Sequence, residues 1–463
     1  MNYDAIVIGA GMSGLAAGIR LAMFGKKVCV LEKHTIAGGL NSYYQRRIKE
    51  TKEIAQFDVG LHALTNFATK GERGKPLTKM LKQLRIPYDD LNLCSQGYSL
   101  IDFPEKQLRF TNDFEFLKNE INEKFPHQID AFNKLVVKIG TFNELDLNAN
   151  YVSSREVLKQ YLSDKLLVEM ILAPLLIYGS AWEKDMDFNQ FVIMFKSIYF
   201  EGFSRPKGGV RTIIDKLISR LKEEGGELRF RHGVEDILTK NGKVVGVRTT
   251  KGEELYSNKV FSSAGLPETM ELAKQESEAS IGRMTFLEAI CLTKSVPTQN
   301  EFGPTIVFHN NSEKYHYEGA KDFFDNRSAV VCCPNNYEPE HRDTYGCFRV
   351  TFMANYEKFK SLERSAYLEK KDQAYEEALK IIKNVSPNVK MDVVLKDVFT
   401  PTTVERYTWK KRGTVYGSPN KIRNGKTDIE GLYVIGTDQG FLGIVGAILS
   451  GISLGNLYGL MES

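Results

Sequence analysis

Residues Ala5-Ile6-Val7-Ile8-Gly9-Ala10-Gly11-Met12-Ser13-Gly14 decide the fold of this chain. Residues 5–8 form a short, uniformly apolar run, which is typical of a strand buried on both faces of a parallel sheet. A helix is predicted over 13–24, Gly25 is expected to end it, and residues 27–31 form a second apolar strand. Strand, helix and strand together predict a βαβ unit.

The glycines after the first strand match a dinucleotide-binding loop. In Gly9-x-Gly11-x-x-Gly14, the first glycine permits a tight turn, the second lets the backbone approach a pyrophosphate, and the third allows close helix–strand packing. The helix that follows would present free N–H groups and a partial positive charge to the phosphates. Glu32, at the end of the second strand, is placed to accept hydrogen bonds from a ribose. An ordinary glycine turn would not account for the acid, so we expect a bound dinucleotide.

Two further segments favour FAD over NAD as this dinucleotide. Gly38-Gly39 would bring the backbone close to the cofactor a second time. Near the C-terminus, the stretch 431–438 is an apolar strand ending in Gly436-Thr437-Asp438, and a glycine-rich helix start follows it. An acid at a strand end and a second helix N-terminus suit a ribityl hydroxyl and the electron-rich side of a reduced flavin.

The remaining pattern predicts an α/β protein with two interleaved domains. Residues 75–204 look largely helical, and Asn241-Gly242 joins two strands of a predicted meander over 227–250. A long charged, amphipathic helix or helix pair is expected over 357–384 and a last helix over about 445–460. We therefore predict a discontinuous Rossmann-like FAD-binding domain with a parallel sheet, helices and a β-meander, from 1–70, 205–280 and 395–463. A mixed α+β substrate domain would comprise a helical insertion, 71–204, and a mixed sheet, 281–394.

Composition limits the partners. The 62 basic and 58 acidic residues leave a net charge of +4, too little for a nucleic-acid surface but compatible with an anionic membrane. The six cysteines show no metal spacing, so no metal site is expected. The N-terminus has no secretory pattern, and no window has about 18 consecutive apolar residues. We expect a cytoplasmic protein that is either soluble or peripheral on one membrane face.

Several segments together resemble the phytoene desaturase, carotenoid isomerase and retinol saturase group of flavoproteins, within the amine oxidase superfamily. They are the stretch 32–39, Phe57-Asp58-Val59-Gly60-Leu61-His62, the segment 400–417 and the C-terminal strand and helix. The resemblance implies that FAD contacts Gly9, Gly11, Gly14, Glu32, Gly38, Gly39, Val234, Gly436 and Asp438, with Gly446 and Ala447 under the isoalloxazine ring.

The resemblance also implies a reaction class. Such enzymes transfer a hydride between flavin N5 and an allylic carbon of a long apolar isoprenoid, carotenoid or lipid, in desaturation, saturation or isomerisation. His62 is the candidate proton donor or acceptor, with a purely structural histidine as the alternative. Glu405 and Tyr416 are further catalytic candidates, each with a structural pairing as its alternative.

Other interpretations remain open at this stage. An amine oxidase-type enzyme would place an aromatic cage at the flavin, for which Tyr407, Trp409 and Tyr416 are available. A non-catalytic flavin-fold protein would bind a lipidated partner, as GDP dissociation inhibitors do. The apolar run 166–182 fits a tunnel wall, a bilayer-dipping segment or simply a buried helix. No second GxGxxG follows a strand, so electrons are expected to pass to or from oxygen, a quinone or a protein.

Overall fold

A five-stranded parallel sheet forms one layer of the computed structural model, which describes residues 1–60, 62–144, 146, 150–277, 281–337 and 344–461. Its strand order is β19-β13-β1-β2-β9, so strands from both ends and the middle of the chain lie side by side. Residues 5–8 are all buried, as the apolar pattern predicts. The strands are β1 (Ala5–Ile8), β2 (Val28–Leu31), β9 (Glu227–Arg229), β13 (Val260–Ser262) and β19 (Leu432–Val434).

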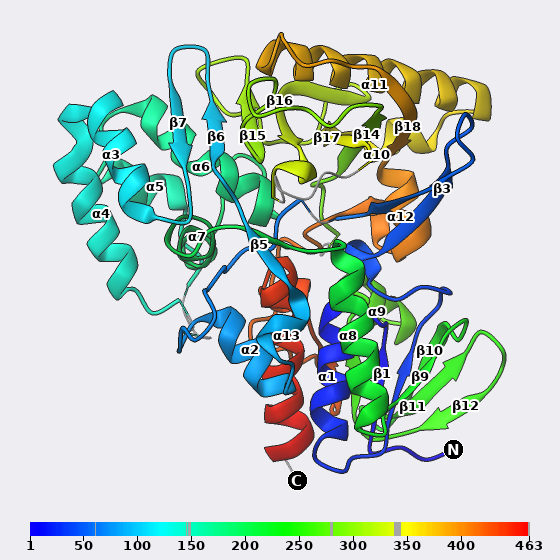
Figure 1. Ribbon diagram of the computed structural model, residues 1–463. Coiled ribbons are helices and arrows are strands. Elements are labelled where there is room, and N and C mark those ends of the chain that lie inside the picture. Colours follow the sequence, from blue (N-terminus) through cyan, green and yellow to red (C-terminus); the bar gives the residue numbers. More distant parts are fainter. Residues whose placement is uncertain (61, 145, 147–149, 278–280, 338–343, 462–463) are drawn as a thin grey trace.

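Helices cover one face of this sheet and a β-meander covers the other. Figure 1 shows α1 (Met12–Ala22), α8 (Val210–Glu223) and α13 (Gly443–Leu454) side by side, with α2 (Pro76–Leu84) against α13. The meander comprises β10 (Val234–Lys240), β11 (Lys243–Thr249) and β12 (Glu254–Tyr256), and its apolar side chains pack with β1 and β2. Asn241 and Gly242 have φ of 52° and 74°, which confirms the predicted tight hairpin. The helix α9 (Leu266–Leu272) follows β13.

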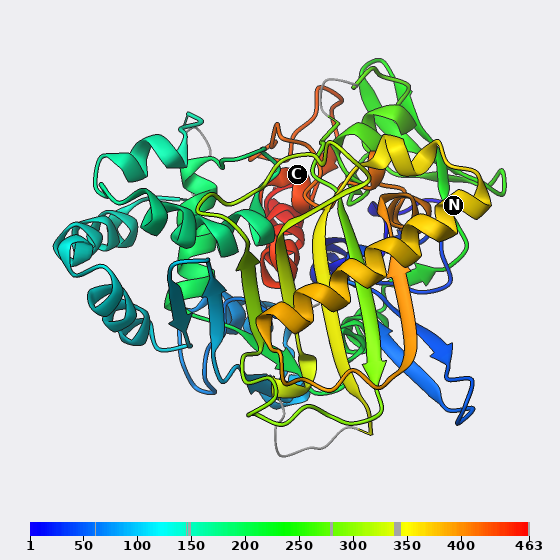
Figure 2. The same ribbon diagram turned by 90° about the horizontal axis from the view of Figure 1, so that it is seen from above.

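A seven-stranded mixed sheet forms the second layer, in the order β18-β14-β17-β16-β15-β6-β7. Only the β15–β6 pair is parallel among its described pairings. Figure 2 shows the long helix α11 (Arg364–Val385) lying across this sheet. The strands are β6 (Ser99–Asp102), β7 (Gln107–Phe110), β14 (Phe286–Thr293), β15 (Ile306–Asn310), β16 (Phe324–Cys332), β17 (Gly346–Ala354) and β18 (Val393–Phe399).

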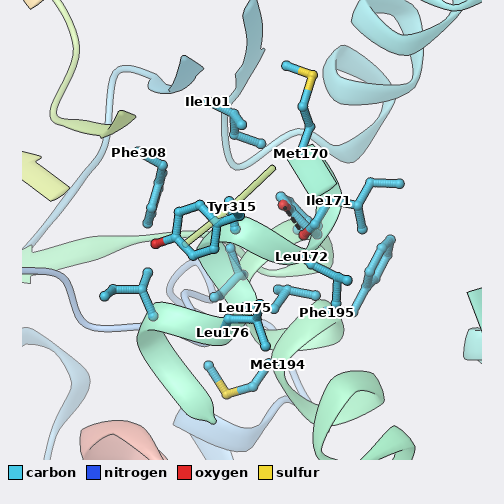
Figure 3. Close-up of a cluster of buried hydrophobic side chains, with 14 of the residues drawn as sticks. Ile101, Met170, Ile171, Leu172, Leu175, Leu176, Met194, Phe195, Phe308 and Tyr315 are labelled. Atoms are coloured by element: carbon cyan, nitrogen blue, oxygen red, sulfur yellow. Dashed lines mark hydrogen bonds between the residues drawn. The ribbon is translucent and has the colours of Figure 1, made fainter. Parts of the chain in front are cut away.

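A cluster of helices packs beside the second sheet. Its centre is α6 (Lys165–Gly179), whose side chains from Met170 to Leu176 contact Phe195, Phe308 and Tyr315 in the buried cluster of Figure 3. The stretch 166–182 is therefore mostly a buried helix, which ends at Gly179, as one of the three interpretations holds. Its last turn, with Ile177 and Tyr178, also lines a cavity, as the tunnel-wall interpretation holds. The other helices are α3 (Phe114–Lys124), α4 (Ile129–Thr141), α5 (Ser154–Lys159) and α7 (Phe188–Phe195).

Short elements connect the two layers. The hairpin β3 (Tyr43–Arg47) and β4 (Ile54–Asp58) packs on β14 and β18, and α10 (Tyr356–Lys360) lies beside α12 (Pro401–Thr408). A further pair joins β5 (Leu93–Ser95) to β8 (Ser204–Pro206).

Two details differ from the sequence-based expectation. The predicted helical insertion contains the strands β5, β6 and β7, and β6 and β7 extend the second sheet. Strand β18 spans the predicted boundary at residue 395 and belongs wholly to that sheet.

Within the described residues, one helical stretch, Gly443–Met461, has the length and composition of a membrane span. Half of its most apolar window is buried inside the molecule, and α13 packs along α1. A core helix has the same properties.

Candidate active site

The glycine loop after β1 has the conformation that phosphate binding requires. Gly9 has φ of +91°, and a Cβ at Gly14 would collide with the Gly9 carbonyl oxygen. Gly11 begins α1 without any side-chain cap, so the first N–H groups of the helix are left for a ligand. The Gly38 N–H donates to the Ala10 carbonyl oxygen at 2.9 Å, which holds the second glycine pair against the first loop.

Glu32 and Val234 lie where a ribose and an adenine are expected. The Glu32 carboxylate accepts hydrogen bonds from the backbone N–H of Ala10 at 2.9 Å and of His34 at 2.8 Å. These bonds fix the carboxylate at the end of β2, and its remaining lone pairs can accept ribose hydroxyls. Glu32 and Val234 both line the cavity described next.

A cavity of about 1380 Å³ extends from this loop to the second sheet. On the side of the first sheet, Gly9, Gly11, Gly38 and Gly39 line it. The start of α13, whose N-cap Leu442 makes no side-chain capping bond, also lines it through Gly443, Ile444 and Ala447. Two uncapped helix N-termini therefore open on one cavity, which fits an extended ligand with anionic groups at two places.

Four of the predicted cofactor residues do not line this cavity: Gly14, Gly436, Asp438 and Gly446. Gly14 packs the helix against the loop, and the Gly436 N–H donates to the Ser450 hydroxyl at 2.7 Å. Gly446 lies against Phe441, whereas its neighbour Ala447 lines the cavity. The structure thus gives these glycines a packing role.

Asp438 is buried behind the cavity wall, and Thr437 occupies the lining position beside it. Its carboxylate accepts hydrogen bonds from the N–H of Leu266 at 2.6 Å and of Ser418 at 2.8 Å. Burial alone raises the pKa of Asp438, but Lys410 and Lys421 hold it below its ordinary value. Burial in turn lowers the pKa of Lys421 to about 8. The partners that the structure gives the Asp438 carboxylate are all protein groups, and its contact with a ribityl hydroxyl stays a prediction.

His62 lines the cavity at the centre of a buried polar cluster. Its Nε2 lies 3.2 Å from Glu288 Oε1 and 3.2 Å from Thr351 Oγ1. Arg349 forms an ion pair with the same Glu288 through Nε, and Arg349 Nη2 donates to the Val59 carbonyl oxygen at 2.8 Å. Tyr178 contacts the imidazole edge to face, with 6.2 Å between ring centroids.

The ionisation of this cluster follows from burial and pairing. Burial lowers the pKa of His62, so its imidazole is neutral near pH 7. Burial alone raises the pKa of Glu288, but Arg349 and His62 hold it below its ordinary value. The Glu288 carboxylate is therefore ionised, and Arg349 compensates its charge.

Glu405 and Tyr416 also line the cavity, but each is engaged with a protein group. Glu405 accepts a hydrogen bond from the Tyr356 hydroxyl at 2.7 Å and pairs with Lys360 at 3.0 Å. The Tyr416 hydroxyl donates to the Ile177 carbonyl oxygen, and its ring contacts Phe286. Both residues therefore have the structural partners that the alternative interpretation gave them.

The three aromatic residues considered for an amine cage have separate surroundings. Tyr407 is 57% exposed and lies beside His34. Trp409 lies under Lys33, whereas Tyr416 packs on Phe286 in the second layer. No described contact brings the three rings together.

Sequence reasoning missed Glu288, Arg349, Thr351 and Tyr178. Glu288 and Arg349 stand in the middle of β14 and β17, and both strands are almost wholly buried. A charged residue inside an apolar strand is the signal that was available, because such a residue needs a buried partner.

The arrangement defines a class of protein. A parallel sheet with a glycine loop, an acid at the end of its second strand and a second uncapped helix facing one cavity is the frame of a dinucleotide-dependent oxidoreductase. Over residues 12–453 the chain matches the family described as flavin containing amine oxidoreductase, and it belongs to that family. It is an FAD-dependent oxidoreductase.

Individual relatives extend this comparison. The chain is 24% identical to prolycopene isomerase 1, chloroplastic, of an Oncidium hybrid cultivar, over 97% of this chain and 83% of the relative. It is 24% identical to all-trans-retinol 13,14-reductase of Danio rerio, over 98% and 86%. An oxidoreductase from Methanosarcina mazei has a similar structure, with a TM-score of 0.67 and 20% identity over 98% and 99% of the two chains. That structural likeness shows the shared fold.

Proposed function

We propose that this enzyme oxidises, reduces or isomerises a carbon–carbon double bond of a long apolar isoprenoid, carotenoid or related lipid. The names of the two relatives, prolycopene isomerase and all-trans-retinol 13,14-reductase, support this substrate class. The cavity supports it independently.

The observation that carries the proposal is the apolar wall around His62. Beside His62 the cavity is also lined by Tyr178, whose hydroxyl is buried without a partner among the described residues. The other side chains that line this part of the cavity are mainly apolar or have their polar atoms bonded elsewhere: Ile177, Met194, Phe286, Val330, Val415, Tyr416 and Leu442. The carboxylate beside them, Glu288, is already paired with Arg349. This surface suits a polyene, which has no charge to desolvate, better than an ammonium group, whose desolvation would need compensation.

The chemistry divides between cofactor and protein. The flavin, when bound, supplies hydride transfer at N5. The Glu288 carboxylate can accept a hydrogen bond from His62 Nε2, so the favoured imidazole tautomer carries its proton on Nε2. This tautomer leaves His62 Nδ1 as the nitrogen that can accept a proton from the substrate. Thr351 and Tyr178 hold the imidazole in place, and the apolar wall excludes water.

Such a substrate resides in membranes, so we also propose a cytoplasmic enzyme that contacts a membrane peripherally. The support is the chemistry of the substrate: a long polyene has little solubility in water.

The test uses the purified holoprotein with detergent-dispersed lycopene isomers and retinol, and in parallel with putrescine and benzylamine. Chromatography detects altered polyenes, with the flavin supplied both oxidised and dithionite-reduced, and a peroxide assay detects amine oxidation. We expect polyene conversion in one flavin state and no rise in peroxide when either amine is added to the oxidised enzyme. Amine turnover without polyene conversion would contradict the proposal.

Mass spectrometry of lipids extracted from the purified protein gives a second readout. We expect a long apolar isoprenoid to co-purify, because a ligand of this kind dissociates slowly into water. Extracts that hold only polar ligands would count against the apolar substrate class.

A further inference from the structure

One section of the cavity wall is basic rather than apolar. It lies between β3, β18, the α10–α11 segment and α12, which are neighbours in Figure 1. We define the basic section by its four cations, Arg46, Lys360, Arg364 and Lys371, which all line the cavity. The apolar side chains of the same segments that line the cavity are Phe359, Leu362, Val398, Phe399 and Val404.

The basic section adjoins the polar cluster around His62. Phe399 stands opposite Glu288 in the pairing of β14 and β18, and Asp397 stands opposite Ile290, two residues along. Two residues of a strand span about 7 Å. A ligand that lies beside His62 and Glu288 could therefore extend past Phe399 to Asp397. Asp397 marks the near edge of the basic section, because Arg46, one of its four cations, pairs with this carboxylate at 3.2 Å.

The cations exceed the acids that face them. Asp397 serves both Arg46 and Lys371, the latter at 3.9 Å, and Glu405 serves Lys360 at 3.0 Å. Arg364 lies over the Tyr367 ring and forms no ion pair with any residue that the structure describes. Four cations facing two carboxylates leave this wall with a net positive charge.

Neutral groups in the same section differ in whether they are already bonded. Thr402 and Thr403, in the first turn of α12, line the cavity, but their hydroxyls bond to Thr400 and Tyr367, and a capping box with Thr400 closes the start of that helix. The Tyr44 hydroxyl also faces this section and is buried without a hydrogen-bond partner among the described residues. A buried hydroxyl without a partner is costly unless a ligand or water satisfies it.

We propose that the basic section binds a terminal oxyanion, a phosphate or a carboxylate, on the isoprenoid substrate. The apolar chain would run past Phe399 toward His62, and Arg364, Lys371 and Tyr44 would bind the anionic end. This inference rests on the proposed function, and it narrows the substrate to an amphipathic isoprenoid with one acidic end. Arginine and lysine are the side chains suited to such groups.

The test measures binding of three C20 ligands to the holoenzyme by the change that each causes in the flavin absorbance spectrum. The ligands are geranylgeranyl phosphate, geranylgeranoic acid and the neutral alcohol geranylgeraniol. We expect the two anions to bind on the order of tenfold more tightly than the alcohol at low salt, the factor that one charge-assisted hydrogen bond gives. High salt should reduce this preference.

Two variants assign the preference to the basic section. Arg364→Gln and Lys371→Gln should each bring the anion-to-alcohol ratio close to one and leave alcohol binding unchanged. Lys380→Gln is the matched control, because Lys380 lies on the same helix α11, pairs with Glu377 and does not line the cavity. Unchanged FAD content in each variant shows that the protein is folded.

The outcomes separate this inference from the proposed function. Equal binding of anions and alcohol to the unmodified enzyme would overturn the inference and leave the apolar substrate standing. If none of the three ligands perturbs the flavin, both fail. Vesicles of phosphatidylglycerol provide the last arm: if Arg364→Gln and Lys371→Gln weaken vesicle binding but keep the anion preference, the cations meet a lipid headgroup and the inference is wrong.

Discussion

His62 is the side chain on which the proposed chemistry depends. It is buried at the cavity wall, and Glu288 and Thr351 fix its ring. Replacement by glutamine keeps a polar group of similar reach but removes the titrating nitrogen. We expect His62→Gln to lower turnover about 100-fold or more, the contribution of a positioned acid or base, without loss of FAD.

The control for this variant is His309→Gln. His309 also pairs with a carboxylate, at 2.6 Å from Asp102, but it does not line the cavity. Steady-state turnover and flavin content of the two variants are compared with the unmodified enzyme. Equal activity of the His62 and His309 variants would assign His62 a purely structural role.

The same histidine makes stability depend on pH. Because burial lowers the pKa of His62, the unfolded chain binds a proton more readily than the folded chain once the pH falls below about 6.5. Because the pKa of Glu288 is held below its ordinary value, the folded state loses further stability as the pH falls below about 4.5.

We therefore expect the free energy of unfolding to decrease as the pH falls from 7 to 5, and to decrease less in His62→Gln. Urea denaturation across this range measures both slopes. Identical slopes for the two proteins would show that His62 is not responsible.

At the scale of elements, Asp58 joins three segments. It ends β4, accepts the N–H of Val210 at the start of α8 at 3.1 Å, and forms an ion pair with Arg205. The Asp58 side chain is 4% exposed and that of Arg205 is 13% exposed. A Cβ at Gly209 would collide with this carboxylate, so the turn before α8 is shaped around it.

We expect Asp58→Asn to destabilise the protein by about 3–5 kcal/mol, because it removes the carboxylate from a buried ion pair with Arg205. Asp215→Asn, which removes a 56% exposed partner of Arg211 on the same helix α8, should cost no more than about 0.5 kcal/mol. Urea unfolding distinguishes the two. A loss below 1 kcal/mol for Asp58→Asn would contradict the assigned role.

The elements that the sequence predicts well are those with local signals. The loop from Gly9 to Gly14 and the hairpin at Asn241 combine turn residues with neighbouring apolar runs, and both have the expected geometry. Strands β6 and β7 have only four residues each, and β6 is held by β15, some two hundred residues away along the chain. Such strands depend on their partners more than on their own composition, which is why the region looked helical.

The candidate site divides in the same way. Backbone roles around Gly11, Glu32 and Gly38 follow from short motifs. The direction of the Asp438 side chain cannot be predicted from a short motif, because Lys410, Lys421 and two backbone N–H groups from other segments determine it. Glu288 is likewise recognisable only once β14 and β17 are paired and Arg349 faces it.

At the scale of the whole molecule, the cofactor site needs both ends of the chain. Strand β1 reaches β19 through β13, and α1 packs along α13. The glycine loop and the α13 N-terminus line one cavity with His62, which follows β4, and the second sheet adds its partners Glu288 and Thr351. A substitution that disturbs the contact between α1 and α13 should therefore weaken FAD binding, although it alters neither the glycine loop nor the α13 N-terminus.

Two glycines of the C-terminal helical stretch test this dependence. A Cβ at Gly451 would collide with the Ser13 carbonyl oxygen of α1, whereas a Cβ at Gly455 would lie 3.7 Å from its nearest neighbours, an ordinary contact. We expect Gly451→Ala to destabilise the protein by about 1–3 kcal/mol, the cost of overpacking, and to weaken FAD binding. Gly455→Ala, four residues further on, should change stability by less than about 1 kcal/mol.

Thermal unfolding with and without added FAD measures stability and FAD affinity together, since a ligand bound only by the folded state raises the unfolding midpoint as its concentration rises. If both variants retain FAD equally, the cofactor site tolerates displacement of α13, and the glycine loop alone determines flavin affinity.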